Sequence, residues 1–240
     1  MTSLAFVSQK KTSDSIDNLT TNLSCSHCSD GFLIRILYFK TSDQRSLSLF
    51  HCSSCSHFQC FRNQSVDIMK ANTKPLAYLK FYDATVDSTS SCIPKVENVT
   101  IESNQDGLEQ YEKMNIPGWT KYFKSFQKSV LEEPEQVIRY HWKGQPLFYG
   151  QDSVSDQLLK SGPPPCAHCG SKRVFECQLM PYFHRILPLP SSKSLSDFKN
   201  VQDFYRHLKE WGTILIYSCE KDCGTSSAAV QEYVAVQWEE

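Results

Sequence analysis

The sequence predicts an α+β protein that is mainly β, with two related zinc-ribbon-like β halves and a few packed helices. The first observation is that cysteines occur in close pairs, in residues 25–55 and again in residues 166–223. The second is that strand-like apolar runs lie between the pairs in both halves. The third is that pair, strand, strand and pair follow in this order twice, which indicates an internal repeat.

Residues 1–23 are rich in Ser, Thr, Asn and Asp, with scattered apolar side chains. This composition favours a flexible leader. The segment lacks the apolar stretch of a signal peptide, and no apolar run in the chain approaches the roughly 18 residues of a membrane-spanning helix. We therefore expect a soluble intracellular protein.

Residues 24–82 are predicted to form the amino-terminal zinc-ribbon-like half. FLIRILYF is strand-like, TSDQ is a turn, and SLSLF alternates polar and apolar residues with period two. Thiolates spaced by two to four residues lie on one tight turn and face one point, so two such turns supply the four tetrahedral ligands of a structural zinc. The predicted ligands of the first zinc are Cys25, Cys28, Cys52 and Cys55.

Residues 83–110 are polar and mildly acidic without clear periodicity, and we interpret them as a linker to a second domain at residues 111–240. A helix is predicted to begin near Thr120 and to end at Pro134. Its apolar face would hold Tyr122, Phe123, Phe126 and Val130. Three lysines on a neighbouring stripe favour a solvated face, with a docking surface for an acidic peptide as the alternative: Lys121, Lys124 and Lys128.

The second domain repeats the cysteine pattern. Strand-like runs follow the first pair and precede the second, and the predicted ligands of a second structural zinc are Cys166, Cys169, Cys219 and Cys223. A helix over residues 194–209 is predicted to cap one face of the sheet. Residues 136–140 and 146–149 look extended, and QEYVAVQW is predicted to be a terminal strand of this second sheet.

Other residues near the motifs have structural explanations. Three cysteines lack paired spacing and are expected to be core or surface thiols: Cys60, Cys92 and Cys177. His27 and His168 lie inside knuckles and could replace a ligand, but four thiolates per half are already present. Arg173 and Glu176 flank Phe175 and are expected to form hydrogen bonds to neighbouring strands, with mutual pairing or ligand binding as the alternative.

Composition favours a protein partner over catalysis. The chain has 240 residues, 25 basic and 26 acidic, and a net charge of -1, so no global field attracts nucleic acid or an anionic membrane. There is no glycine-rich phosphate loop, no His-Glu-x-x-His and no Gly-x-Ser-x-Gly, which predicts a non-enzyme. The odd number of cysteines, 11, and the missing signal peptide favour reduced thiols on metal.

Several strings in the second domain resemble the carboxy-terminal domain of the programmed cell death protein 2 family, over about residues 118–238. They are FQKSVLEEPEQVIRYHWKGQPLF, PPPCAHCGSKRVFECQLMPYF and WGTILIYSCEKDC, followed by EYVAVQ. The positions that match the family pattern are Pro134, Gln136, Arg139, Tyr140, Cys166, Cys169, Gly170, Arg173, Phe175, Glu176, Gln178, Met180, Pro181, Trp211, Gly212, Thr213, Tyr217, Cys219 and Cys223.

The amino-terminal half resembles the family more loosely, through its two Cys-x-x-Cys pairs and the Arg-x-Gln string from Arg62 to Gln64. It lacks the Gly-Gly-x-Pro-x-Trp opening and the compact Cys/His cluster of a MYND zinc finger. The chain is therefore more similar to the shorter programmed cell death protein 2-like branch and its yeast relative.

The resemblance implies a dedicated chaperone for a newly made small-subunit ribosomal protein of the S-five family, in cytoplasmic steps of ribosome biogenesis, with the nucleus as a second location. Such a chaperone needs an acidic or aromatic groove, or an exposed sheet edge that adds the client as a strand. One alternative is an RNA-binding zinc-ribbon protein that uses the three helix lysines with Lys172 and Arg173. Another is an apoptosis- or proliferation-linked interaction protein, which only the family's name suggests.

Overall fold

The structure is a computed structural model, and it describes residues 3–10, 20–42, 45–52, 54–64, 77–83, 120–186, 210–224 and 229–239. Strands dominate this part of the chain, which contains ten strands and three helices. The prediction of a mainly β protein with few helices is confirmed. Among the described residues, no helix is both long enough and apolar enough to cross a membrane.

Two antiparallel three-stranded meanders form the centre of the sheet. The first meander consists of β3 (Phe32–Ser42), β4 (Arg45–Cys52) and β5 (Phe58–Gln64), and the second of β8 (Arg173–Leu179), β9 (Trp211–Cys219) and β10 (Val230–Trp238). Cys52 pairs with Leu33 in the first meander, and Cys219 pairs with Arg173 in the second. The corresponding cysteines therefore end corresponding hairpins, so the repeat seen in the sequence is also a repeat in the strand pairing.

The two meanders belong to one sheet, because β10 pairs with β5 as well as with β9. Val230 is opposite Arg62, and Glu232 is opposite Cys60. The expectation that each half has its own sheet is therefore wrong. A three-stranded meander with one apolar face cannot cover that face alone, and here both meanders cover a shared core.

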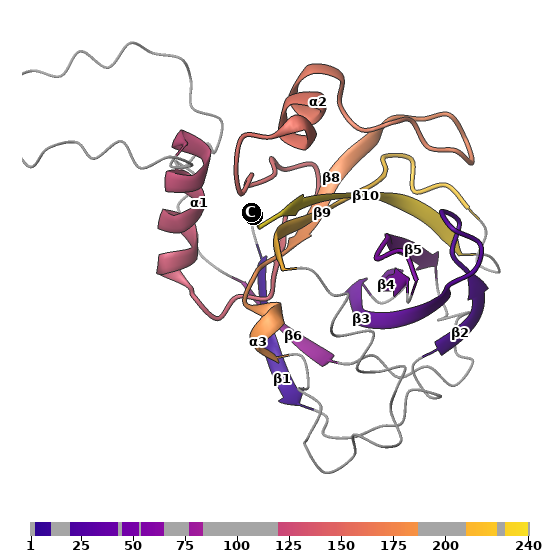
Figure 1. Cartoon of the computed structure of the whole chain (residues 1–240), viewed down its shortest axis with the longest axis horizontal. Helices are drawn as coiled ribbons and strands as arrows, with labels where there is room; N and C mark the ends of the chain where they lie inside the picture. Colours follow the sequence, from indigo (N-terminus) through magenta and orange to yellow (C-terminus); the bar gives the residue numbers. More distant parts are fainter. Residues whose placement is uncertain are drawn as a thin grey trace, which may run out of the picture.

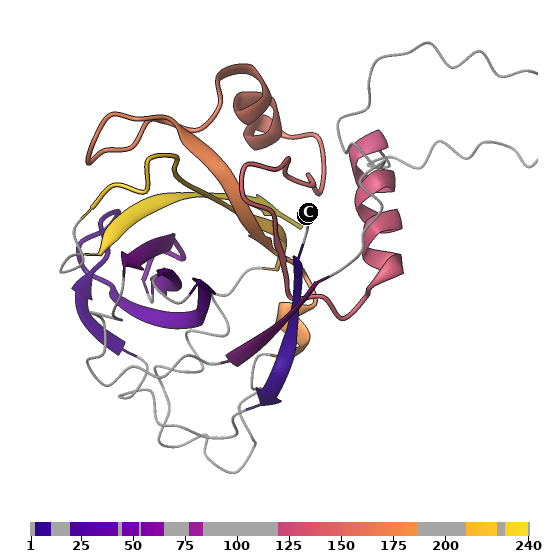
Figure 2. The same cartoon turned by 180° about the vertical axis from the view of Figure 1, so that it is seen from behind.

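Three further strands close the sheet into a barrel (Figures 1 and 2). They are β7 (Ile138–Tyr140), β1 (Ser3–Lys10) and β6 (Ala77–Asp83), in this order beyond β8. The ring closes where β6 pairs in parallel with β3, at Leu37 and Tyr38. Nine of the ten described strands thus form a ring, and β2 (Thr20–Ser24) adds to β3 outside it.

Residues 1–23 were expected to be a flexible leader, but they include β1 and most of β2. Strand β1 pairs with β6 on one side and with β7 on the other. These partners lie far along the chain, so a short and weakly apolar segment becomes a strand through tertiary pairing.

The barrel interior is filled by side chains from both meanders. The main cluster contains Ile36, Leu49, Phe58, Cys177 and Ile214, all buried. Trp211 is fully buried and stands edge-on to Phe58, with a centroid distance of 5.4 Å. Because one core serves both meanders, the two halves are expected to unfold together.

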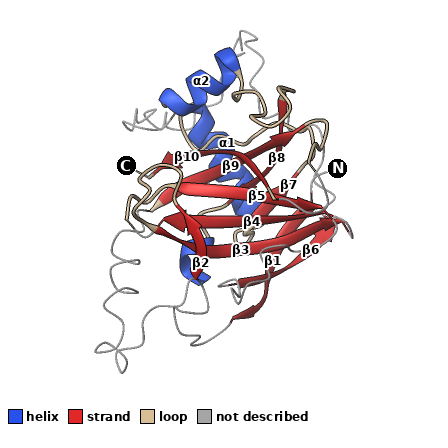
Figure 3. Cartoon of the chain, turned by 90° about the vertical axis from the view of Figure 1, so that its right-hand side faces the viewer, coloured by secondary structure: helices blue, strands red, loops and turns tan. Residues whose placement is uncertain are grey.

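Helices lie on the outside of the barrel (Figure 3). Helix α1 (Lys121–Glu132) follows the predicted bounds, and the Thr120 hydroxyl caps it by accepting the Phe123 N–H at 3.2 Å. Its buried Phe126 packs against Leu147 and Met180. The two other described helices are α2 (Ser153–Ser161) and the single turn α3 (Phe183–Ile186).

Helix α2 was not predicted, although Asp152 and Ser155 form a capping box at its start. Of the two extended segments predicted before it, the first contains β7, while the second is a loop. Gln178 holds this loop as a strand would, because its side-chain amide bonds the N–H and the carbonyl of Leu147 at 2.8 and 3.0 Å. The predicted helix at 194–209, the linker residues 84–110 and Cys92 lie outside the described residues.

Candidate metal centres

The eight predicted ligand cysteines lie in two clusters, each made by two knuckles at the end of a hairpin. Within each cluster all four sulfurs lie within 4.8 Å of one another: Cys25, Cys28, Cys52 and Cys55 in the first cluster, and Cys166, Cys169, Cys219 and Cys223 in the second. The structure therefore brings together the residues that the sequence grouped.

The first cluster joins the turn after β2 to the turn after β4. The Cys25 and Cys55 sulfurs are 3.6 Å apart, as are those of Cys28 and Cys52. The N–H of His27 points at the Cys25 sulfur at 3.4 Å, and the N–H of Ser54 points at the Cys52 sulfur at the same distance. Such N–H groups stabilise thiolate charge and fix the direction of the sulfurs.

The second cluster joins the turn before β8 to the turn after β9. The sulfur pairs Cys166 with Cys223 and Cys169 with Cys219 are both 3.5 Å apart. Gly170 has a φ of 72° immediately after the second cysteine of its knuckle, where Ser29 and Ser56 of the first cluster have φ values of 62° and 58°. These left-handed residues let the chain turn back after presenting its two sulfurs.

This geometry suits a four-thiolate metal site. A tetrahedron with metal–sulfur bonds of about 2.3 Å has edges of about 3.8 Å, close to the observed sulfur separations. Four sulfur ligands leave no open coordination position, so such a centre holds chain segments together and does not activate water.

Acidities within the clusters differ with their surroundings. Hydrogen bonds from the side chain and backbone of Ser171 lower the pKa of Cys169 to about 6. Burial raises the pKa of Cys52 and of Cys219. A bound cation would reverse the effect of burial, because it favours the thiolate form of every ligand.

In the described part of the chain, the remaining thiols and histidines lie outside both clusters. Cys60 and Cys177 are fully buried in the barrel core, and burial raises the pKa of each, so they are core thiols as predicted. His27 stacks on His57 with ring centroids 5.0 Å apart, and His168 is exposed on its knuckle. Neither His27 nor His168 joins a candidate metal group among the described residues.

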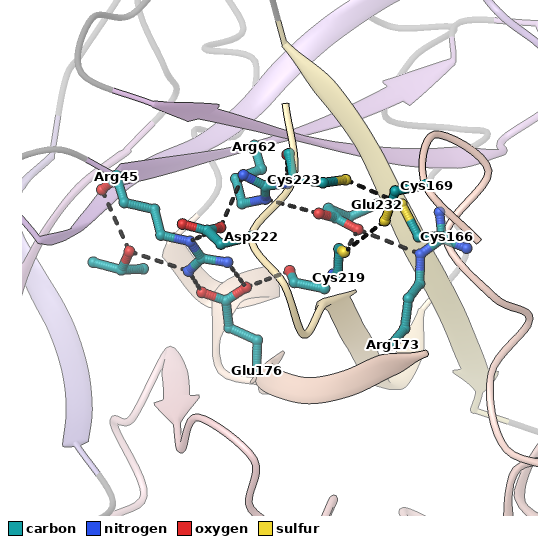
Figure 4. Close-up of polar contacts among 12 residues, drawn as sticks. Arg45, Arg62, Cys166, Cys169, Arg173, Glu176, Cys219, Asp222, Cys223 and Glu232 are labelled. Carbon is teal, nitrogen blue, oxygen red and sulfur yellow. Dashed lines mark hydrogen bonds and ion pairs between the residues drawn. The ribbon is translucent and has the colours of Figure 1, made fainter. Parts of the chain in front are cut away.

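A chain of charged side chains, most of them buried, runs from the second cluster into the first meander (Figure 4). Glu232 accepts the Cys219 N–H at 3.1 Å and pairs with Arg62 at 2.8 Å and with Arg173 at 3.3 Å. Asp222, which lies between the last two ligands, pairs with Arg62 at 2.8 Å and with Arg45 at 3.0 Å.

The same chain continues to Glu176, whose carboxylate pairs with Arg45 and accepts the hydroxyl of Ser218. Burial opposes the positive charge of Arg62, but the hydrogen bond that Arg62 donates to Glu232, together with the nearby charges of Glu232 and Asp222, outweighs burial, so the pKa of Arg62 is raised. Three guanidinium groups thus balance three carboxylates, and the side chains other than that of Asp222, which is 41% exposed, are largely buried. We call these six residues the charged network: Arg45, Arg62, Arg173, Glu176, Asp222 and Glu232.

The expected roles of Arg173 and Glu176 are confirmed, because both bond neighbouring strands and loops. Sequence reasoning missed Arg45, Asp222 and Glu232. Arg45 is far along the chain from the other two. Arg45 and Glu232 each have a polar neighbour in the sequence, a pattern that is typical of charges that face solvent. Asp222 lies between two predicted ligands, so its position is the one signal in the sequence that could have linked any of these three residues to the cluster.

The lysines of the predicted helical stripe are all exposed: Lys121, Lys124 and Lys128. Lys172 is also exposed, and it pairs with Glu220 at 3.3 Å. Arg173 is part of the charged network. Of the residues proposed for RNA contact, the three helix lysines therefore remain available on the surface.

Comparison with known proteins places the second domain in a family. The family model described as "Programmed cell death protein 2, C-terminal putative domain" matches residues 120–238. This segment contains β7 to β10, α1 to α3 and the whole second cluster.

Individual relatives match between 49% and 59% of this chain. Programmed cell death protein 2-like of Gallus gallus is 32% identical over 59% of this chain and 34% of its own length, and its Homo sapiens counterpart is 38% identical over 49% and 28%. "Probable 20S rRNA accumulation protein 4" of Schizosaccharomyces pombe is 32% identical over 55% and 32%. The chain thus spans about a third of the length of these relatives. No solved structure matches it significantly.

Proposed function

Because the chain belongs to the programmed cell death protein 2 family through residues 120–238, we propose that it is a non-enzymatic chaperone of a newly made small-subunit ribosomal protein of the S-five family. The observation that carries this proposal is the match to a fission yeast relative named for 20S rRNA accumulation, which links the family to ribosome biogenesis. The specific client comes from the family resemblance of the sequence.

The proposal includes two structural zinc ions, one in each cysteine cluster. Four cysteine ligands in a tetrahedral arrangement are typical of zinc, and closed sites of this kind contribute to folding. Such centres would hold both knuckle pairs rigid. A rigid chaperone lowers the entropy lost on binding, because only the client segment has to become ordered.

The barrel changes the expected mode of binding. A strand-adding chaperone needs an open sheet edge, but nine described strands are in a ring, and β2 is the strand with a single described neighbour. Basic ribosomal segments would then be held mainly by side chains on the outer surface. The groove expected from the resemblance is therefore to be sought outside the barrel.

A pull-down with the tagged full-length chain from a translating extract tests the proposal. We expect the S-five-family protein to be recovered equally with and without RNase, and depletion of this protein to lower the ratio of small to large ribosomal subunits on a gradient. Recovery that lacks this ribosomal protein, or an unchanged subunit ratio, contradicts the chaperone function.

The RNA-binding alternative rests on the exposed lysines of α1. It predicts that RNase removes the bound material and that affinity for RNA falls steeply with salt, because phosphate contacts release counterions. Replacing Lys121, Lys124 and Lys128 by Gln should abolish binding in that case. The chaperone function predicts that this triple variant still binds the ribosomal protein.

A further inference from the structure

A groove of about 220 Å³ lies on the outer surface where the end of α1 approaches α3. Figure 1 shows this corner, with the carboxy-terminal end of α1 turning toward α3. The lining is mostly apolar and comes from both sides: Val130, Pro134, Gln136, Met180, Pro181, Tyr182 and Arg185. The volume is below the roughly 300–1,000 Å³ of typical small-molecule sites, so one or two peptide side chains fit it better than a cofactor.

The end of α1 beside this groove, outside its lining, carries an exposed apolar side chain and negative charge. Leu131, next to the lining residue Val130, is 78% exposed, the most exposed of the large hydrophobic side chains in the described part. Glu132, Glu133 and Glu135 follow it, and all three are exposed. The helix end adds partial negative charge from its free carbonyls, and no basic residue lies in its last turn.

We propose that this groove binds a basic segment of the client through one apolar anchor side chain followed or preceded by Lys or Arg. The inference rests on the proposed function, because it takes the occupant to be a segment of the ribosomal protein. The apolar lining desolvates the anchor, and the carboxylates attract the flanking cation. Arg185 lies on the α3 side, so the client's cation must lie on the α1 side.

A second outer groove, of about 250 Å³ beside α2, provides an internal control. Its lining also contains apolar side chains, among them Phe148 and Leu158, and Leu159 there is 45% exposed. Its polar rim carries Lys143, which pairs with Glu220, instead of a row of carboxylates. Electrostatic attraction is therefore not expected to favour binding of a basic segment to this second groove.

The test compares two double variants of the full-length chain. Leu131→Ser with Glu135→Lys alters the end of α1 beside the first groove, and Leu159→Ser with Asp156→Lys makes the same kinds of change in α2 at the second groove. Each is measured for binding to overlapping synthetic peptides of the S-five-family ribosomal protein and for capture of that protein from translating extract. We expect the α1 variant to lose at least about tenfold in affinity for one basic peptide, and the α2 variant to stay within about twofold.

Thermal unfolding of both double variants checks that the barrel is still folded. A third variant, Glu133→Gln with Glu135→Gln, keeps Leu131 and so tests the effect of the negative charge alone. This charge variant should lose a few-fold in affinity at low salt and little at high salt. If the wild type captures the ribosomal protein and the α1 variants bind it equally well, the groove assignment is wrong and the chaperone function stands. If the wild type does not capture the ribosomal protein, both the groove assignment and the chaperone function are wrong.

Discussion

The first cysteine cluster packs against side chains of its own meander, whereas the second touches a chain of charges that reaches the other meander. Around the first cluster lie Leu33, Phe50 and Phe61, all from the first meander. Around the second, Glu232 holds the backbone of Cys219, and Arg62 donates to the carbonyl of Cys223 at 2.5 Å. The same ligand pattern therefore closes one hairpin in the first half and joins both halves in the second.

The same cysteine motif therefore has different structural roles in the two halves. Arg62 comes from β5 and Arg45 from β4, so two strands of the first meander depend on groups beside the second cluster. We infer that loss of the second centre would weaken the coupling between the meanders and thereby destabilise the whole barrel. Loss of the first centre would weaken mainly its own hairpin.

The largest expected effect is therefore that of Cys219→Ser. A structural zinc contributes on the order of 10 kcal/mol of apparent folding free energy, comparable to the stability of a whole domain, so this variant should lose its cooperative thermal transition. Cys52→Ser, at the equivalent place in the first cluster, should keep a cooperative transition at lower temperature. Circular dichroism during heating distinguishes them, and an equal loss in both variants would contradict the unequal roles.

A smaller effect is expected for Glu232→Gln, because this change removes the negative charge that pairs with buried Arg62. Breaking a buried ion pair by removing one member costs about 3–5 kcal/mol. The matched control is Glu220→Gln, because Glu220 pairs with exposed Lys143 and Lys172, and exposed pairs contribute about 0–1 kcal/mol. Urea unfolding measures the loss of unfolding free energy in each of the two variants. A Glu232 effect as small as that of Glu220 would show that the charged network does not couple the meanders.

The smallest expected effect is that of Cys177→Ser. Its thiol lies in the core and outside both clusters, so the change should cost about 1 kcal/mol and leave the metal content unchanged. Urea unfolding and elemental analysis check the two parts of this prediction. Loss of a metal ion from this variant would mean that the assignment of ligands is wrong.

The sequence reveals the features that depend on neighbours along the chain. Cysteine spacing identifies both clusters, and helical periodicity with Thr120 and Pro134 identifies α1. Closure of the barrel rests instead on short pairings between distant segments, such as Ala5 with Ile138 and Leu37 with Ala77. No local pattern encodes such pairings.

The charged network has the same origin. Arg45 and Glu176 are 131 positions apart, and each becomes buried only when β4 and β8 are in place. An isolated charge in a sequence favours a solvated position, because burial without a partner is costly. The partner is visible only in the folded chain, so the link between the second cluster and the first meander could not be predicted.

The metal content of the purified full-length chain tests the central claim most directly, because the whole account depends on two filled four-cysteine centres. Elemental analysis of the wild type should give two zinc ions per chain, and Cys52→Ser should retain one, held by the second cluster. Absence of zinc from the wild type, or a single ion that Cys52→Ser and Cys219→Ser both remove, would contradict the account.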